Sequence, residues 1–165
     1  MKGDMFMAKI NTIKEYDVAN GPGVRMSVWF QGCPHHCPGC HNPETWDFKG
    51  GYEIEYEELE QKILKALNEN GVQRNLSLLG GEPLCNENIQ YTVRLAAAAK
   101  KAYPNITIYC WTGSTYEQIL KQYGSTVLDN IDILIDGPFI MKQRDITLHL
   151  RGSKNQRVLI KNIDF

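Results

Sequence analysis

Strand-like and helix-like segments alternate along residues 24–135, joined by short connections. The β-rich segments, expected to form strands, are 24–30, 76–79, 106–111, 131–135 and 158–160. The segments with apolar residues at helical spacing are 53–68, 88–102 and 115–123. Right-handed crossovers between such units give a parallel sheet with helices on its outer face. Because four to six units are too few for a closed barrel of about 250 residues, the sequence predicts an α/β fold, an open, partial β/α barrel forming a single domain over residues 1–165.

Composition places the chain among ordinary globular proteins. Hydrophobic residues make up 42% and charged residues 22%, and the formal net charge is −1. No basic field indicates nucleic acid or an anionic membrane, and no run of about 18 apolar residues predicts a membrane span. Free thiols belong in a reducing compartment. We therefore expect a cytoplasmic protein that binds neither nucleic acid nor membrane.

Three cysteines lie within eight residues, at Cys33, Cys37 and Cys40, with the spacing C-x3-C-x2-C. Iron–sulfur clusters normally take four cysteine ligands. Three with no obvious fourth predict a 4Fe–4S cluster whose remaining iron is open to a substrate or cofactor. Pro34 and Pro38 each follow a cysteine and stiffen the loop. The three cysteines are therefore both the predicted metal ligands and the predicted catalytic residues.

Other interpretations of the cysteines stay open. A structural zinc site could add His35, His36 or His41, but zinc sites usually join two ligand pairs a dozen or more residues apart, and only one pair is visible. Disulfides are disfavoured because the chain has five cysteines and shows no secretory signal. Cys85 and Cys110 are expected to be packing residues rather than ligands.

Motifs that suit a ligand follow the predicted strands. Parallel α/β sheets bind ligands at the carboxyl ends of their strands. Gly80-Gly-Glu-Pro83 follows the second strand: its glycines allow close approach to the backbone, and Glu82 can accept a hydrogen bond from an ammonium group. Trp111-Thr-Gly113 and Asp136-Gly-Pro138 follow the next two strands, although each fits a plain strand-to-helix turn equally well.

Taken together, these motifs resemble those of the radical S-adenosylmethionine (SAM) superfamily, and within it the activating proteins of anaerobic (class III) ribonucleoside-triphosphate reductase. The resemblance runs in order from about residue 15 to residue 160. The stretches that carry it are 21–25 (GPGVR), 32–42 (GCPHHCPGCHN), 45–46 (TW), 79–84 (LGGEPL), 111–113 (WTG), 135–137 (IDG) and 151–156 (RGSKNQ). The last of these separates this family from other small activating enzymes.

The resemblance implies a partial barrel of radical SAM type and an oxidoreductase that activates a glycyl-radical enzyme. Cys33, Cys37 and Cys40 would hold the 4Fe–4S cluster, and SAM would chelate the open iron. A flavodoxin or ferredoxin would supply an electron, and the resulting 5′-deoxyadenosyl radical would install a glycyl radical on the large reductase subunit. The residues implied for cofactor binding are Gly39, Cys40, His41, Gly80, Gly81 and Glu82. The small chain leaves the radical site open on one side, which favours a macromolecular substrate that closes it.

One position departs from the superfamily pattern. Many members carry an aromatic residue just before the third cysteine, near the adenine, whereas this chain has Gly39. His41 or Trp46 is expected to supply the contact instead.

Three rival functions remain. One is another small radical SAM enzyme, similar to a pyruvate formate-lyase activase or a 7-carboxy-7-deazaguanine synthase, against which the 151–156 segment argues. The second is a non-catalytic electron carrier, which would have four cysteine ligands and no Gly-Gly-Glu-Pro. The third is a zinc-binding interaction module. Iron and zinc analysis of protein purified without oxygen separates the last two.

Overall fold

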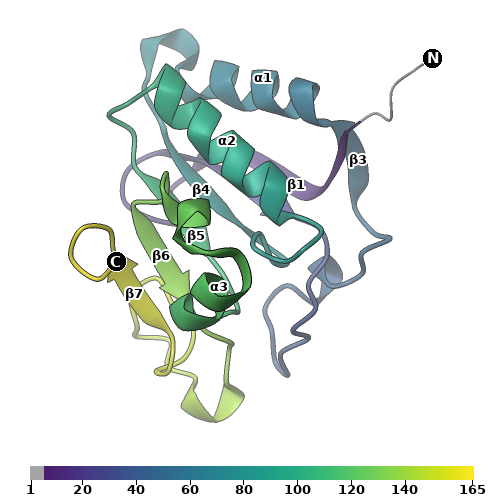
Figure 1. The fold of residues 1–165 in the computed structure, drawn as a ribbon, viewed down its shortest axis with the longest axis vertical. Coiled ribbons are helices and arrows are strands. Elements are labelled where there is room, and N and C mark those ends of the chain that lie inside the picture. The colour runs from purple at the N-terminus through teal and green to yellow at the C-terminus, as the bar shows by residue number, and fades with distance from the viewer. Residues whose placement is uncertain (1–5) are drawn as a thin grey trace.

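Residues 6–165, described by a computed structural model, form a seven-stranded sheet with three α-helices on one face (Figure 1). The strands are β1 (Met7–Asp17), β2 (Arg25–Phe30), β3 (Tyr52–Glu55), β4 (Asn75–Gly80), β5 (Ile108–Trp111), β6 (Ile133–Asp136) and β7 (Arg157–Ile160). The helices are α1 (Tyr56–Leu67), α2 (Ile89–Ala102) and α3 (Tyr116–Tyr123). Short 3-10 turns lie at 43–45, 69–71, 125–128 and 141–143.

The sheet is open, with strand order β3-β1-β2-β4-β5-β6-β7. The four central strands, β2, β4, β5 and β6, are parallel, which confirms the predicted α/β fold with an unclosed sheet. The sequence did not predict the direction of the outer strands. β7 runs antiparallel to β6, and β1 runs antiparallel to both β2 and β3.

Two strands, β1 and the edge strand β3, were not predicted from the sequence. Residues 53–55 were assigned to the start of a helix, but they pair with Met7–Lys9 in β3. Ile54 is buried while Glu53 and Glu55 are exposed, which is the alternation of a strand. The segment is too short for this alternation to identify a strand from the sequence alone. Pairing with β1 therefore overrides the helical preference of the two glutamates.

Strand alternation gives the sheet two different faces. Met26, Val28 and Phe30 of β2 join the hydrophobic core beneath the helices. Ser27 and Trp29 alternate with them and point to the opposite side, hereafter the helix-free face. The same alternation continues in β4 and β5. β4 is buried on both sides along residues 76–79, whereas Tyr109 and Trp111 of β5 are half-buried on the helix-free face.

Helical spacing fixes the other half of the core. Leu59, Ile63 and Leu67 recur along one side of α1 and are fully buried. α3 begins with a reciprocal cap: the Thr115 hydroxyl accepts from the Gln118 backbone N–H, and the Gln118 side chain accepts from the Thr115 N–H. Every helix within residues 6–165 is too short or too polar to cross a bilayer.

Candidate cofactor site

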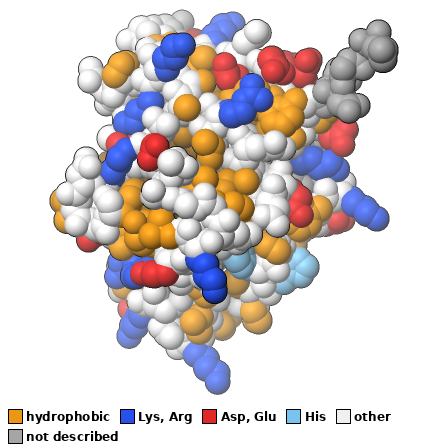
Figure 2. All heavy atoms as spheres, in the orientation of Figure 1, with side chains coloured by type: hydrophobic (Ala, Val, Ile, Leu, Met, Phe, Trp, Pro, Cys, Tyr) orange, Lys and Arg blue, Asp and Glu red, His pale blue; other side chains and the backbone are white. Residues whose placement is uncertain are grey.

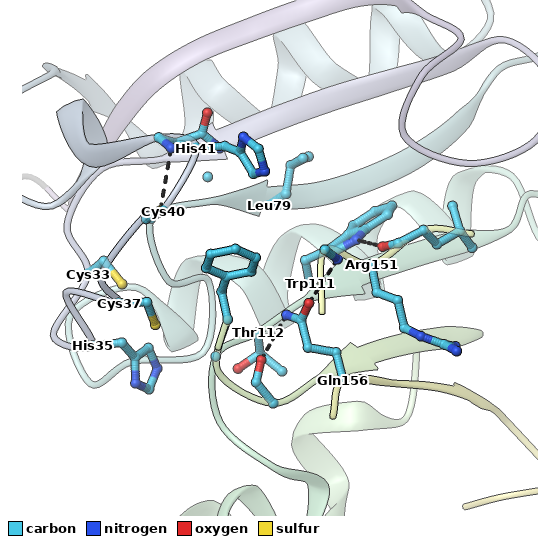
Figure 3. Close-up of a pocket in the computed structure, with 18 of the residues that line it drawn as sticks. Cys33, His35, Cys37, Cys40, His41, Leu79, Trp111, Thr112, Arg151 and Gln156 are labelled. Atoms are coloured by element: carbon cyan, nitrogen blue, oxygen red, sulfur yellow. Dashed lines mark hydrogen bonds between the residues drawn. The ribbon is translucent and has the colours of Figure 1, made fainter. Parts of the chain in front are cut away.

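A cavity of about 460 Å³ lies at the carboxyl ends of the parallel strands (Figure 3). Its walls come from the cysteine loop, the Gly80-Gly81 turn after β4, the 111–113 turn after β5 and two stretches of the chain between β6 and β7. Figure 3 shows the cysteines on one side of this space and Trp111, Arg151 and Gln156 on the other. Segments far apart in sequence therefore meet where the strand-end rule predicts a ligand.

The cysteine loop is held in place by backbone hydrogen bonds. The N–H groups of Gly32 and Cys33 donate to the carbonyls of Thr45 and Trp46, at 2.7 and 3.1 Å. The Cys40 N–H donates to the Cys37 carbonyl at 3.0 Å, which closes a turn around the second and third thiols. All three cysteines line the cavity, Cys33 buried and the other two half-buried.

The donor chemistry of the loop fits an iron–sulfur cluster. Within residues 6–165, no three His, Cys, Asp or Glu side chains gather closely enough to hold one metal ion. Cysteine thiolates are the usual ligands of iron–sulfur clusters, and the three thiols that line the cavity can supply them. Burial raises the pKa of the Cys33 thiol to about 11, so its thiolate needs the positive charge of a bound metal group.

Glu82 joins three loops instead of facing the cavity. Its carboxylate is buried and accepts hydrogen bonds from the Leu84 N–H at 2.9 Å and from the Gly113 N–H at 2.7 Å. His35 Nε2 lies 2.7 Å from the same carboxylate, and this hydrogen bond raises the pKa of His35. Glu82 therefore ties the cysteine loop to the ends of β4 and β5, while Gly80 and Gly81 line the cavity itself.

The turn after β4 has no room for side chains. A Cβ on Gly81 would lie 2.3 Å from the Gly32 carbonyl oxygen, and one on Gly80, whose φ is +120°, would lie 2.4 Å from the Phe30 nitrogen. The Gly32 carbonyl in turn accepts a hydrogen bond from the Glu82 N–H at 2.9 Å. Glycine is therefore needed for the turn to pack against the base of the cysteine loop.

Gly39 lies beside the chain that follows β6 but stays exposed. A Cβ on Gly39 would lie 2.8 Å from Met141 Cε and 3.4 Å from the Phe139 ring. Phe139 lines the cavity and lies 5.9 Å from the His41 ring, centroid to centroid. Trp46 instead stacks on His36 at 4.8 Å and is not part of the cavity wall. Of the two aromatic candidates from the sequence, the structure brings His41 to the cavity, and it adds Phe139.

The 151–156 segment forms the opposite wall. The Gln156 side chain accepts from the Gly152 N–H at 2.9 Å and donates to the Gly137 carbonyl at 3.0 Å. Asn155 Nδ2 donates to the Pro138 carbonyl at 2.7 Å, and Trp111 Nε1 donates to the Leu150 carbonyl at 2.7 Å. Asn155 and Gln156 therefore hold this segment against the backbone that follows β6. No local sequence pattern places the segment opposite the cysteines; only the family resemblance linked the two.

The two remaining cysteines lie outside the cavity wall. Cys85 and Cys110 are both buried, and burial raises the pKa of the Cys85 thiol to about 12. Cys110 packs in the hydrophobic core with the strand residues beside it. Both positions agree with a packing role.

Fold and site together define a class: an open α/β sheet with a three-cysteine loop at its strand ends. A family model described as a 4Fe-4S single cluster domain matches residues 19–159. A protein named anaerobic ribonucleoside-triphosphate reductase-activating protein from Vibrio cholerae is 39% identical over 85% of this chain and 90% of its own length. Proteins of the same name are 36% identical in Escherichia coli K12, over 86% of this chain and 92% of theirs, and 34% identical in Enterobacteria phage T4, over 86% and 87%.

The chain belongs to the family of anaerobic ribonucleoside-triphosphate reductase-activating proteins. That membership confirms the predicted family of activating enzymes, and the family model supports the predicted 4Fe–4S domain. The solved structure of QueE from Escherichia coli is also similar, with a TM-score of 0.43 and 17% identity over 70% of this chain and 58% of that one.

Proposed function

We propose that this protein uses a 4Fe–4S cluster and SAM to install a glycyl radical on an anaerobic ribonucleoside-triphosphate reductase. One observation carries the proposal: Cys33, Cys37 and Cys40 line the same cavity as the Gly80-Gly81 turn at the carboxyl ends of the parallel strands. The names of the relatives supply the target, because each relative is named as an activator of that reductase. The cytoplasm is the compartment we propose.

The chain's own residues divide into holding and orienting groups. Cys33, Cys37 and Cys40 would bind three irons and leave the fourth for the amino and carboxylate groups of SAM. The backbone at Gly80 and Gly81 can approach the amino group closely, because neither residue has a side chain. The bound group would supply one-electron chemistry: a reduced cluster would donate an electron to SAM, which would yield methionine and a 5′-deoxyadenosyl radical able to take a hydrogen atom from a glycine of the reductase.

Glu82 acts in this proposal by positioning the loop. Its carboxylate already accepts three hydrogen bonds, one of them from the His35 side chain in the cysteine loop. It therefore fixes the loop against the turn that would receive SAM. Cys40, His41 and Phe139 line the cavity, and Gly39 lies next to Phe139 outside the wall. The adenosine would sit against the rings of His41 and Phe139.

A spectrum of the reductase tests the proposal. The experiment mixes the reconstituted protein, SAM and a chemical reductant, without oxygen, with the anaerobic reductase of the same organism. In the cell we propose that a flavodoxin or ferredoxin is the reductant. We expect a carbon-centred doublet in the electron paramagnetic resonance spectrum that requires all components. If 5′-deoxyadenosine accumulates without a doublet, the reductase is not the substrate. If a fully loaded cluster gives neither signal, the proposed chemistry is wrong.

A further inference from the structure

The chain between β6 and β7, residues 139–156, forms a folded projection beside the cavity. The Asp145 N–H donates to the Gly152 carbonyl and the Lys154 N–H to the Gln143 carbonyl, both at 3.0 Å. These bonds pair the two arms and leave residues 146–150 as the tip. In Figure 1 this projection is the yellow-green loop at the lower end of the molecule. We call residues 139–156 the β6–β7 projection.

Apolar side chains run from the cavity onto the surface of the projection. Leu148 and Leu150 line the cavity. Met141 is 53% exposed and Ile146 is 82% exposed. Exposed aliphatic groups that continue from the wall of a binding cavity mark a surface that a partner can cover.

The projection is also basic. It carries Lys142, Arg144, Arg151 and Lys154 against a single acid, Asp145, in a chain whose formal net charge is −1. Figure 2 shows Lys and Arg side chains beside hydrophobic atoms at the same lower end of the molecule. The excess of positive charge is therefore local.

These cations are available to a partner. None of the ion pairs found within residues 6–165 involves them. Arg157, just beyond the projection, is instead paired with Asp136 and Glu117. Arg151 lines the cavity, and its buried Nε has no hydrogen-bond partner among the described residues.

We propose that the β6–β7 projection is the docking surface for the protein substrate, and that it receives an acidic segment of that partner beside the reacting glycine. This inference rests on the proposed function and adds the face and the chemistry of recognition. The cations would attract the carboxylates, and Met141 and Ile146 would be covered by apolar groups. A protein fits better than a nucleic acid, because Met141 and Ile146 are exposed aliphatic groups and no Phe, Tyr or Trp of the projection is exposed as a platform for bases.

Reversing the charge of two cations tests whether they attract the acidic segment of the partner. In Lys142→Glu/Arg144→Glu we expect the dissociation constant for the reductase to rise about tenfold or more, and its dependence on salt to weaken. Formation of 5′-deoxyadenosine by the activating protein alone, with SAM and a chemical reductant, should stay within about twofold of wild type, because neither side chain lines the cavity. The matched control is Lys62→Glu/Lys65→Glu, the same charge change on the exposed side of α1, which should bind the reductase as wild type does.

A second variant tests whether apolar groups of the partner cover the exposed aliphatic side chains of the projection. Ile146→Ser should weaken reductase binding about fivefold at every salt concentration and leave partner-free cleavage of SAM intact. The inference is overturned if both variants bind and activate the reductase normally, if the α1 control loses affinity equally, or if the projection variants lose partner-free cleavage. The inference is also overturned if the wild-type protein binds single-stranded DNA and Lys142→Glu/Arg144→Glu abolishes that binding while binding to the reductase persists. These results are distinct from a failure of the proposed function, in which wild type itself gives no glycyl radical.

Discussion

The two faces of the sheet are built from neighbouring residues yet have different chemistry. Leu78 of β4 packs beneath the helices in the hydrophobic core, whereas Leu79, one residue on, lines the cavity. On the helix-free face Arg25 is fully buried, donates to Ser77 Oγ at 2.7 Å and lies over the Tyr109 ring at 4.2 Å. Burial lowers the pKa of Arg25 to about 10, which still leaves it charged near neutrality.

This difference assigns separate tasks to the faces. The helix-covered face is aliphatic and closely packed, so it contributes most of the hydrophobic stabilisation. The helix-free face carries buried polar groups and borders the cavity, so its side chains are the ones that can contact a bound cofactor. Substitutions on the two faces should therefore separate stability from cofactor binding.

The largest expected effect is on the helix-covered face. Leu78→Ala removes a fully buried side chain and should lower the free energy of unfolding by about 2–5 kcal/mol. Leu79→Ala borders an existing cavity and should cost about 1–2 kcal/mol, while weakening SAM binding. Urea denaturation of the metal-free protein measures both. Equal losses would contradict the separation of the two faces.

Gly81→Ala should act on the site more than on stability. Its Cβ would meet the backbone oxygens of Gly32 at 2.3 Å and of Thr45 at 2.8 Å, and so would push the cysteine loop away from the turn. We expect SAM affinity, measured by calorimetry on the cluster-loaded protein, to fall more than about tenfold, which is more than about 1.4 kcal/mol.

Gly71→Ala is the control for Gly81→Ala. Gly71 has φ +73° and no neighbour within 4 Å of an added Cβ, so this change adds about 1–2 kcal/mol of backbone strain far from the cavity. SAM affinity should be unchanged. If Gly71→Ala lowers it as much as Gly81→Ala does, the crowding argument is wrong.

The smallest effect concerns Asp17, next to the helix-free face. Burial raises its pKa, but hydrogen bonds from Ser27, Asn20 and Ala19 outweigh burial and lower the pKa overall. The ionised carboxylate therefore stabilises the fold above the unfolded pKa of about 3.9, and this contribution is lost as pH falls through the lower folded value.

Urea midpoints of wild type and Asp17→Asn at pH 7, 5 and 3 measure this contribution. Asp17→Asn should be less stable than wild type at the two higher pH values, and the difference should shrink at the lowest. A difference that does not depend on pH would assign the stabilisation to packing instead of charge.

The sequence predicted the parts of the molecule that local patterns encode. The four central strands and three helices follow from periodicity, and the cysteine loop follows from its spacing. β3 was missed because only Ile54 of its four residues is buried, and one apolar residue is too few to show the two-residue alternation of a strand. Phe139 was missed because its place over Gly39 depends on the path of the chain after β6, which no local pattern specifies.

The assignment of the site to Cys33, Cys37 and Cys40 is tested by the electron paramagnetic resonance spectrum of the reduced, reconstituted protein before and after addition of SAM. For wild type we predict a 4Fe–4S signal, with about four irons per chain, that SAM alters by binding the open iron. Cys37→Ala should lose both the signal and its response to SAM, whereas Cys85→Ala, which removes a buried thiol outside the cavity wall, should keep both. A full cluster signal in Cys37→Ala, or its loss in Cys85→Ala, would contradict the assignment of the site to the three-cysteine loop.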